Sequence, residues 1–148
     1  MQAHYGHPAG CTIAQIIAES SYQGDLSQLA KEDHNLFGMK WANSFAECDG
    51  VVGPTNWDTN EEYDGQYVQI NDAFIEFESD KDCIKFRSAV FLQASTYADN
   101  ALIQQAIAER SSTLMAQGLQ DAGWATDSSY ANKLIAIMDQ YDLYRLDI

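Results

Sequence analysis

The sequence predicts an α+β fold that is mostly helical and carries one small β-hairpin. Apolar residues recur with helical spacing in the first and last parts of the chain, and β-forming residues flank an Asp64-Gly65 turn between them. Helices set apart from a small antiparallel sheet are typical of this class. With 148 residues, one domain can bury about two-thirds of its unfolded surface, so we expect a single domain over 1–148.

The first predicted helix runs from Thr12 to Tyr22, after a lead-in of residues 1–10, with Thr12 as its N-cap. A rotation of about 100° per residue places its three isoleucines on one face and Glu19 at the rim of that face. A carboxyl partly withdrawn from water tends to have a raised pKa, which suits a general acid. Most helix glutamates are surface groups, so this helix alone favours a solvated Glu19 and leaves the general acid as a hypothesis.

Short helical turns and a loop are expected next. Gly24 breaks the first helix, and residues 26–31 can form one or two further turns. Residues 42–54 are loop-like because Asn, Asp, Gly and Pro cluster there.

The hairpin is predicted from two β-leaning runs, around 56–59 and 67–70, and residues 74–77 can extend the second strand. The Asp-Gly pair is a strong turn signal. Glu61 and Glu62 fall between the two runs, so we expect both in the hairpin loop.

The last part of the chain is expected to be helical. Ser79 is the predicted N-cap of one helix, because acidic residues follow it in the first turn. Three further segments, 100–108, 112–122 and 129–141, show helical periodicity.

The charge balance bears on the partners of the chain. Twenty-two acidic and eight basic side chains give a net charge of −14, which repels nucleic acid and anionic membrane surfaces and favours a neutral or cationic partner. No run is long enough for a membrane span, and the N-terminus lacks the basic and apolar regions of a secretion signal, so no membrane insertion is expected.

The three cysteines, Cys11, Cys48 and Cys83, lack the spacing of a zinc site. We therefore expect neither a metal nor a cofactor. One pair can bridge in an oxidising compartment, or all three can be buried thiols, and the sequence leaves both open.

Five motifs follow one another along residues 8–143. They are Ala14–Ser20 (Ala-Gln-Ile-Ile-Ala-Glu-Ser), Asn35–Lys40 (Asn-Leu-Phe-Gly-Met-Lys), Thr59–Glu61 with Gly65, Phe74–Ser79, and Gly123–Leu134. In this order they resemble the glucosaminidase family of peptidoglycan hydrolases, glycoside hydrolase family 73, which includes autolysin and flagellar-muramidase-like domains. The resemblance implies a lysozyme-like α+β fold with the hairpin beside an active-site groove. It also implies endo-acting cleavage of the β-1,4 bond after N-acetylglucosamine in peptidoglycan glycan strands.

The resemblance also implies catalytic residues. The family's catalytic acid corresponds to Glu19, and its hairpin glutamate corresponds best to Glu61, because Thr59 and Gly65 stand at the family's offsets. Glu62 is the reserve for this second group, which would activate water or act as a nucleophile. The 2-acetamido group of the substrate is a further route that needs no protein base. In a chain this acidic, both hairpin glutamates can also be no more than an exposed tip.

Tyr130 matches a tyrosine that lies near the catalytic acid in the family. Its phenol can hydrogen-bond a sugar, or its ring can simply pack against the last helix, and both readings stay open. Thr126 and Asp127 are expected to cap that helix.

Four aromatic residues offer flat apolar surface for sugar rings: Phe37, Trp41, Trp57 and Trp124. Trp41 and Trp57 are the better candidates for a groove, whereas Phe37 is more typical of a core.

Some positions depart from the family pattern. Ser21-Tyr22 replaces the usual Gly-aromatic pair after the catalytic acid. Ile75 stands where the family usually has arginine, Phe77 where it has tyrosine, and Ser128 where it has proline. None of these changes removes a catalytic carboxylate, but they can alter the shape of the groove.

Three functions compete: an N-acetylglucosaminidase, a muramidase or lytic transglycosylase of the same fold, and a catalytically silent wall-binding module. The substrate predicts an extracellular or cell-wall location, with a phage lysin as the less expected origin, and we expect a monomer. Gram-positive walls are anionic, so this acidic chain should dock on them poorly, and we expect wall-binding modules outside it.

Overall fold

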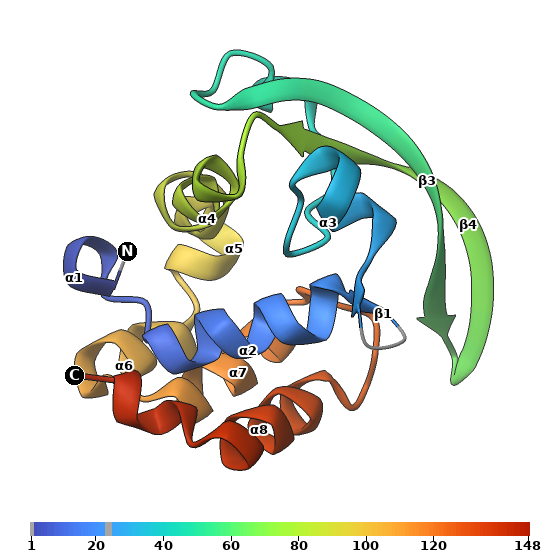
Figure 1. Cartoon of the computed structure of the whole chain (residues 1–148). Helices are drawn as coiled ribbons and strands as arrows, with labels where there is room; N and C mark the ends of the chain where they lie inside the picture. Colours follow the sequence, from blue (N-terminus) through green and yellow to red (C-terminus); the bar gives the residue numbers. More distant parts are fainter. Residues whose placement is uncertain (1, 23–24) are drawn as a thin grey trace. The chain divides into compact units, whose positions relative to one another are not determined.

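The structure is a computed structural model that describes residues 2–22 and 25–148 (Figure 1). Its contacts divide the chain into two compact units, residues 1–18 with 88–148 and residues 19–87. The chain therefore leaves the first unit once and returns to it. Gly24, the predicted helix breaker, lies outside the described residues.

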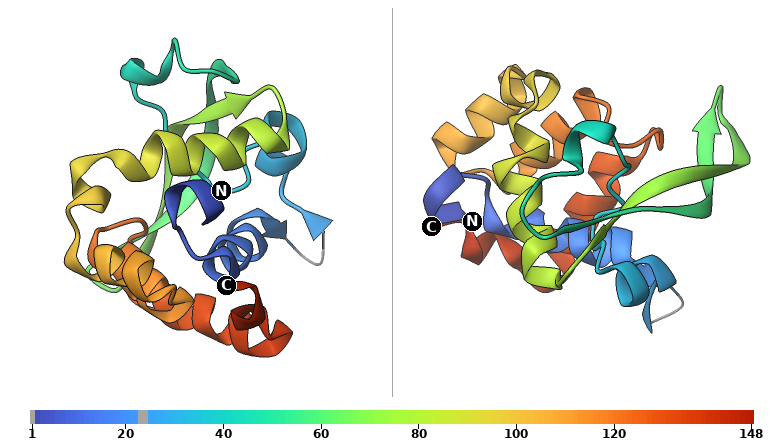
Figure 2. Two further views of the ribbon diagram at one scale, coloured as in Figure 1. Left: turned by 90° about the vertical axis from the view of Figure 1, so that its left-hand side faces the viewer. Right: turned by 90° about the horizontal axis from the view of Figure 1, so that it is seen from above.

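The first unit is built of helices. They are α1 (Gln2–Tyr5), α2 (Ala9–Ser20, which continues into the second unit), α5 (Ser95–Ala98), α6 (Ala101–Glu109), α7 (Ser112–Asp121) and α8 (Tyr130–Tyr141), with 3-10 turns η2 (Phe91–Gln93) and η3 (Leu143–Leu146). The predicted helices over 100–108, 112–122 and 129–141 are thus confirmed to within one or two residues. Figure 2 shows these helices from two further sides.

The core of the first unit forms where the apolar faces of its helices meet. Its buried members include Cys11, Ala14, Ile103, Ala106, Met115, Ala116, Leu119, Leu134 and Met138. Gly118 allows α6 and α7 to approach closely, because a Cβ at this position would lie 2.6 Å from Cγ1 of Ile103. Leu134 and Met138, four residues apart on α8, belong to this buried face.

Helix α2 begins three residues earlier than predicted. Thr12 is its fourth residue, and its hydroxyl donates to the Pro8 carbonyl at 3.2 Å, so the N-cap prediction was wrong. The first-turn N–H groups of Gly10 and Cys11 donate instead to Asp147 Oδ1 and Ser112 Oγ, both at 2.9 Å. Groups about 100 residues or more away along the chain therefore satisfy this helix start.

The start of α8 also differs from the prediction. Ser129 occupies the N-cap, and the Asp127 carboxylate accepts the Ser129 N–H at 2.8 Å, just outside the helix. The Ala131 N–H donates to the Gln120 side chain of α7 at 2.7 Å. Asp127 therefore accepts a backbone N–H at the helix start as predicted, but a side chain from the neighbouring helix satisfies the N–H of Ala131, which was not predicted.

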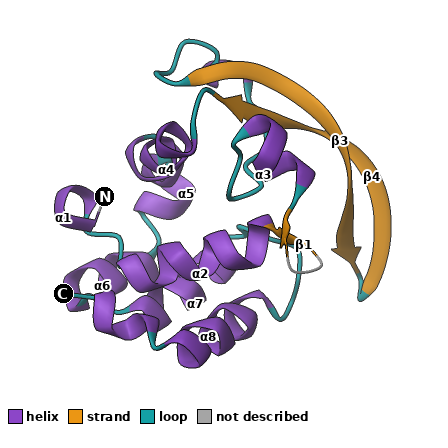
Figure 3. Cartoon of the chain, viewed as in Figure 1, coloured by secondary structure: helices purple, strands orange, loops and turns teal. Residues whose placement is uncertain are grey.

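The second unit holds the β-structure, coloured orange in Figure 3. Its elements are β1 (Ser21–Tyr22), β2 (Asp25–Leu26), α3 (Gln28–Asp33), η1 (Asn43–Phe45), β3 (Val51–Tyr63), β4 (Gln66–Phe77) and most of α4 (Asp80–Ala89). Ser79 caps α4 as predicted, because its hydroxyl accepts the Asp82 N–H at 3.1 Å. The two-residue ladder of β1 and β2 was not predicted.

The hairpin of β3 and β4 is longer than predicted. Asp64 and Gly65, with φ of 51° and 77°, form its two-residue turn, as expected for a tight hairpin with both central residues at positive φ. Glu61 and Glu62 therefore lie inside β3, opposite Val68 and Tyr67, and their placement in a loop was wrong. The Asp-Gly turn was therefore predicted at the correct residues.

Alternate residues of β3 share a half-buried face, which we call the Trp57 face. On β3 it carries Thr55, Trp57, Thr59 and Glu61, while the residues between them are exposed. Their partners on β4 point to the same side, because directly paired residues of antiparallel strands do so. Helix α3 lies on the concave side of the hairpin in Figure 1.

The α+β class is confirmed, with helices predominating and one main antiparallel hairpin. Within the described residues, no helix combines the length and apolar character needed to cross a membrane.

Leu134→Ala tests the core of the first unit. Leu134 is fully buried, so removing most of its side chain should lower the free energy of unfolding by about 2–5 kcal/mol. Urea denaturation measures this change, with the exposed neighbour Asn132→Ala as control. Equal effects of the two substitutions would contradict this account of the core.

Candidate active site

Glu19 stands at the C-terminal end of α2, half-buried, where the second unit begins. Its carboxylate lies against Gly38, since a Cβ on Gly38 would be 3.3 Å from Glu19 Oε2. Gly38 also has a φ of +66°, which L side chains rarely adopt. Glycine is therefore suited to this position for its backbone conformation and for the room it leaves to the carboxylate.

Asn35 fixes the loop that carries Gly38. Its fully buried side chain donates to the Met39 and Ile75 carbonyls at 2.9 and 2.8 Å and accepts the Met39 N–H at 3.0 Å. Ile75 belongs to β4, so these bonds join the loop to the hairpin. The conformation of the Asn-Leu-Phe-Gly-Met-Lys motif thus depends on one amide side chain.

Lys40 follows this loop and binds two carboxylates. Its Nζ lies 2.7 Å from Glu61 Oε1 and 3.1 Å from Asp72 Oδ2. Burial alone would lower the pKa of Lys40, but its hydrogen bonds to Glu61 and Asp72 raise it overall. The bond from Lys40 lowers the pKa of Asp72. Lys40 and Asp72 are therefore both best described as charged.

Glu61 and Glu62 face opposite sides of the hairpin, because successive side chains of a strand alternate. Glu61 shares the Trp57 face with Lys40, and only 12% of its side chain is exposed. Glu62 pairs with Tyr67 on the other face. The strand alternation thus separates the two candidates that the sequence left side by side.

Trp57 is held by a carboxylate that sequence reasoning missed. Asp33, at the end of α3, is buried, and its Oδ2 accepts the indole N–H of Trp57 at 2.8 Å. The Thr55 hydroxyl donates to the same oxygen. These bonds fix the edge of the indole ring, which remains half-buried.

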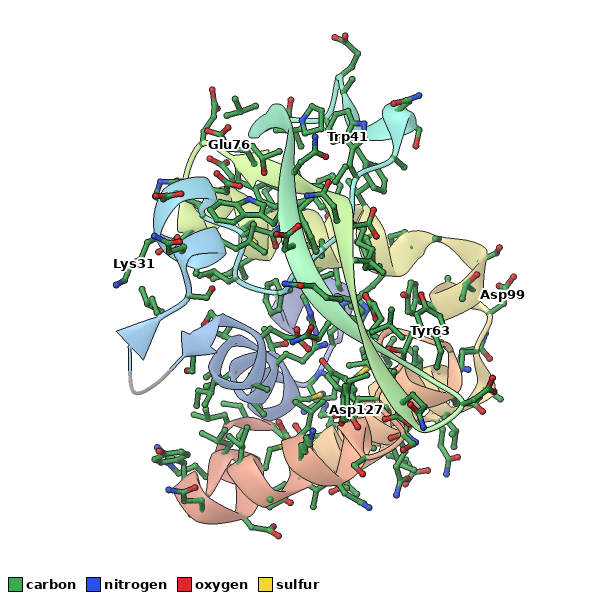
Figure 4. The ribbon with its side chains drawn as sticks, turned by 90° about the vertical axis from the view of Figure 1, so that its right-hand side faces the viewer. Lys31, Trp41, Tyr63, Glu76, Asp99 and Asp127 are labelled. Atoms are coloured by element: carbon green, nitrogen blue, oxygen red, sulfur yellow. The ribbon has the colours of Figure 1, made fainter. Side chains whose placement is uncertain are left out.

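The remaining aromatic candidates differ in exposure. Phe37 is fully buried, with the Arg87 guanidinium 5.0 Å above its ring, so it is a core residue and its assignment to the substrate was wrong. Trp41 is half-buried and donates its indole N–H to Asn43 at 3.0 Å. Figure 4 shows Trp41 far from Tyr63, which lies near the turn of the hairpin.

Two of the predicted site residues, Trp124 and Tyr130, belong to the first unit. Trp124 packs among aromatic rings, with centroids of Phe91 and Tyr97 at 5.1 and 5.8 Å. Tyr130 is buried at the start of α8, and its hydroxyl accepts a hydrogen bond from Gln15 of α2 at 2.8 Å. Gln15 stands one helical turn before Glu19 on α2.

The cysteines Cys11, Cys48 and Cys83 are free thiols. Burial raises the pKa of Cys83 to about 12, so it stays protonated and inert. In the described ranges, no three His, Cys, Asp or Glu side chains are grouped to hold a metal ion.

Comparison with known proteins identifies the family of the chain. A family model for glucosaminidases, described as mannosyl-glycoprotein endo-beta-N-acetylglucosaminidase, matches residues 1–143. The chain belongs to the glucosaminidase family. The resemblance drawn from the five sequence motifs is thereby confirmed.

One curated relative of this glucosaminidase chain is the exo-glucosaminidase LytG of Bacillus subtilis (strain 168). The two are 27% identical over 136 residues, which is 92% of this chain and 45% of LytG. The chain therefore spans about half the length of this relative.

Solved structures show the same fold. An N-acetylmuramoyl-L-alanine amidase from Staphylococcus aureus matches with a TM-score of 0.77 and 26% identity, over 99% of this chain and 39% of that one. The catalytic domain of the autolysin Auto from Listeria monocytogenes matches with a TM-score of 0.66 and 26% identity, over 98% and 78%. The predicted lysozyme-like α+β fold is confirmed.

The departures from the family pattern in β4 have a simple packing consequence. Ile75 and Phe77, which replace arginine and tyrosine, are fully buried or nearly so. They add apolar side chains to the core of the second unit and leave the residues of the Trp57 face unchanged.

Gly38→Ala tests the contact with Glu19. A side chain at positive φ costs about 1–2 kcal/mol, and the added methyl group would displace the Glu19 carboxylate. Hydrolysis of purified cell wall should fall about tenfold or more, beyond any loss of folded protein measured by urea denaturation.

Gly53→Ala is the matched control for this substitution, because Gly53 has no atom within 4 Å of the added Cβ and no positive φ. If both variants keep full activity, the contact between Gly38 and Glu19 does not position the carboxylate.

Proposed function

We propose that this chain hydrolyses the β-1,4 bond after N-acetylglucosamine in peptidoglycan glycan strands. The observation that carries the proposal is the segment Gly38–Lys40. Gly38 lies against the Glu19 carboxylate, and Lys40 binds the Glu61 carboxylate. Because the Cα atoms of two residues separated by one other are at most about 7 Å apart, a single short segment organises both acids.

Glu19 is the general acid in this proposal. The C-terminal end of a helix carries partial negative charge, so its field favours a neutral carboxyl at Glu19 over an ionised one. Glycosidic cleavage requires a proton on the leaving oxygen, and a half-buried neutral carboxyl can supply it.

Glu61 is the second carboxylate. Its ion pair with Lys40 favours the charged form, which can activate water or meet the oxocarbenium-like transition state from the other face of the sugar. Glu62 points to the opposite side of the hairpin, so Glu61 is the stronger candidate.

Aromatic residues supply the sugar contacts in this proposal. The indole of Trp57 has a fixed edge and a half-exposed ring, which suits stacking on the apolar face of a sugar. Trp41 is a second such surface in the same unit. Tyr130 is buried with its hydroxyl bonded to Gln15, so it is left out of the proposed sugar contacts. Trp124 contributes through packing within its aromatic cluster.

Cleavage within the strand is the mode favoured by the description of the family, whereas the name of LytG favours release from a chain end. Mass spectrometry of products separates the modes. Endo-acting cleavage yields a range of oligosaccharides early in the digest, and exo-acting cleavage yields only the smallest product. The proposed substrate implies action outside the cell or in the cell wall.

Glu19→Gln tests the general acid. The amide cannot donate the required proton, so the release of reducing ends from purified peptidoglycan should fall at least about 100-fold. Glu47→Gln, an exposed glutamate of the same unit, should leave the rate unchanged. Full activity of Glu19→Gln would overturn the role.

The wild-type digest tests the bond that is cleaved. A new reducing end on N-acetylglucosamine is expected. A new reducing end on N-acetylmuramic acid would identify a muramidase, and an anhydro-sugar would identify a lytic transglycosylase. Wall binding without soluble products would favour a silent module.

Glu61→Gln and Glu62→Gln form a matched pair for the second group. We expect the first to reduce hydrolysis at least about 100-fold and the second to leave it within about twofold, because only Glu61 lies on the Trp57 face. Initial rates on the same peptidoglycan measure both. The reverse order would assign the role to Glu62, and two active variants would favour participation of the 2-acetamido group.

A further inference from the structure

We propose that Lys40 is a positioning residue that holds the Glu61 carboxylate in a fixed, ionised state on the Trp57 face. The proposal rests on the function proposed for Glu61. Lys40 acts through Glu61 and is not itself required to touch the sugar.

The backbone of Lys40 is anchored to the hairpin. Lys40 pairs with Phe74 in an isolated antiparallel bridge at the edge of β4 that β3 leaves open. The Trp41 N–H donates to the Ala73 carbonyl at 2.9 Å, and the Ile75 N–H donates to the Met39 carbonyl at 3.1 Å. The side chain of Lys40 therefore starts from a fixed point.

The strand register explains how Lys40 reaches two carboxylates. Lys40 lies opposite Phe74, so it shares the Trp57 face with Asp72, which is two residues earlier on β4 and nearer the turn. Glu61 lies on the same face, closer to the turn. The Lys40 ammonium thus links Asp72, in the middle of β4, to Glu61, which lies nearer the turn.

The charges of Lys40, Glu61 and Asp72 together favour an ionised Glu61. The ammonium contacts one oxygen of Glu61 and one of Asp72. One positive and two negative charges leave a net charge of −1, so Glu61 is stabilised as an anion without being fully neutralised. An ionised carboxylate is the form that a base or nucleophile needs.

The experiment compares Lys40→Met with Lys85→Met on soluble peptidoglycan strands. Both substitutions remove one positive charge from an exposed lysine, but Lys85 lies on α4, away from the contacts of Lys40 with Glu61 and Asp72. Lys40→Met should lower kcat about tenfold with a smaller change in KM and move the acidic limb of the pH profile to higher pH. Lys85→Met should change neither, and Lys40→Arg should restore part of kcat.

A double variant tests whether Lys40 acts through Glu61. In the Glu61→Gln background, Lys40→Met should cause no further loss, because the group it positions is gone. A further tenfold loss, or equal activity of Lys40→Met and Lys85→Met, would overturn the proposal.

A measurement without activity separates this proposal from the proposed function. NMR titration of the Glu61 carboxyl should show a higher midpoint in Lys40→Met than in the wild type or Lys85→Met. If that shift occurs while the wild type cleaves no glycan, the proposed function fails and the Lys40 contact stands. If the midpoint is unchanged, the positioning role fails whatever the activity.

Discussion

The hydrogen bonds of one buried amide, Asn35, are the constraint on which the rest of the candidate site depends. Its side chain joins Met39 of the loop to Ile75 of β4, with both its acceptor and its donor group used. Each such bond contributes about 1 kcal/mol, and a buried group left without its partner costs about 1–3 kcal/mol. The loop cannot shift without losing several of these bonds together, so Gly38 and Lys40 on either side of Met39 stay fixed.

The register of the hairpin then determines which of two neighbouring carboxylates, Glu61 or Glu62, faces Lys40. Lys40 shares a face with Asp72 and Glu61 because β4 pairs with β3 in one register. A slip of one residue would turn Glu61 away and present Glu62. The two-residue turn at Asp64 and Gly65 prevents that slip, since its length and its positive φ values fix the register. The turn therefore influences the chemistry, although it contributes no functional side chain.

Much of the fold could be predicted because its signals are local. The helical period identified α6, α7 and α8, and the Asp-Gly pair located the turn. The errors have a different origin. Helix α2 starts early because Asp147 and Ser112 satisfy its first N–H groups, and α8 uses Gln120 from its neighbour. Such partners lie far away along the chain, and no local pattern reveals them. The motifs nominated Glu19 and Glu61 as candidates, whereas no pattern nominated Asp33 or Lys40, because their contacts with Trp57 and Glu61 appear only once the fold and the strand register are known.

The acidity of the chain makes the contact between Lys40 and Glu61 more important. With 22 acidic and eight basic side chains, cations that can pair with a carboxylate on the hairpin are scarce. Asp72 on the Trp57 face would by itself disfavour an ionised Glu61. Lys40 binds both carboxylates, so the net electrostatic effect of its neighbours on Glu61 favours the ionised form. The Asn35 bonds keep the backbone of Lys40 in place. On this proposal a single cation, on a loop fixed by Asn35, sets the ionisation state of a carboxylate in a strongly anionic molecule.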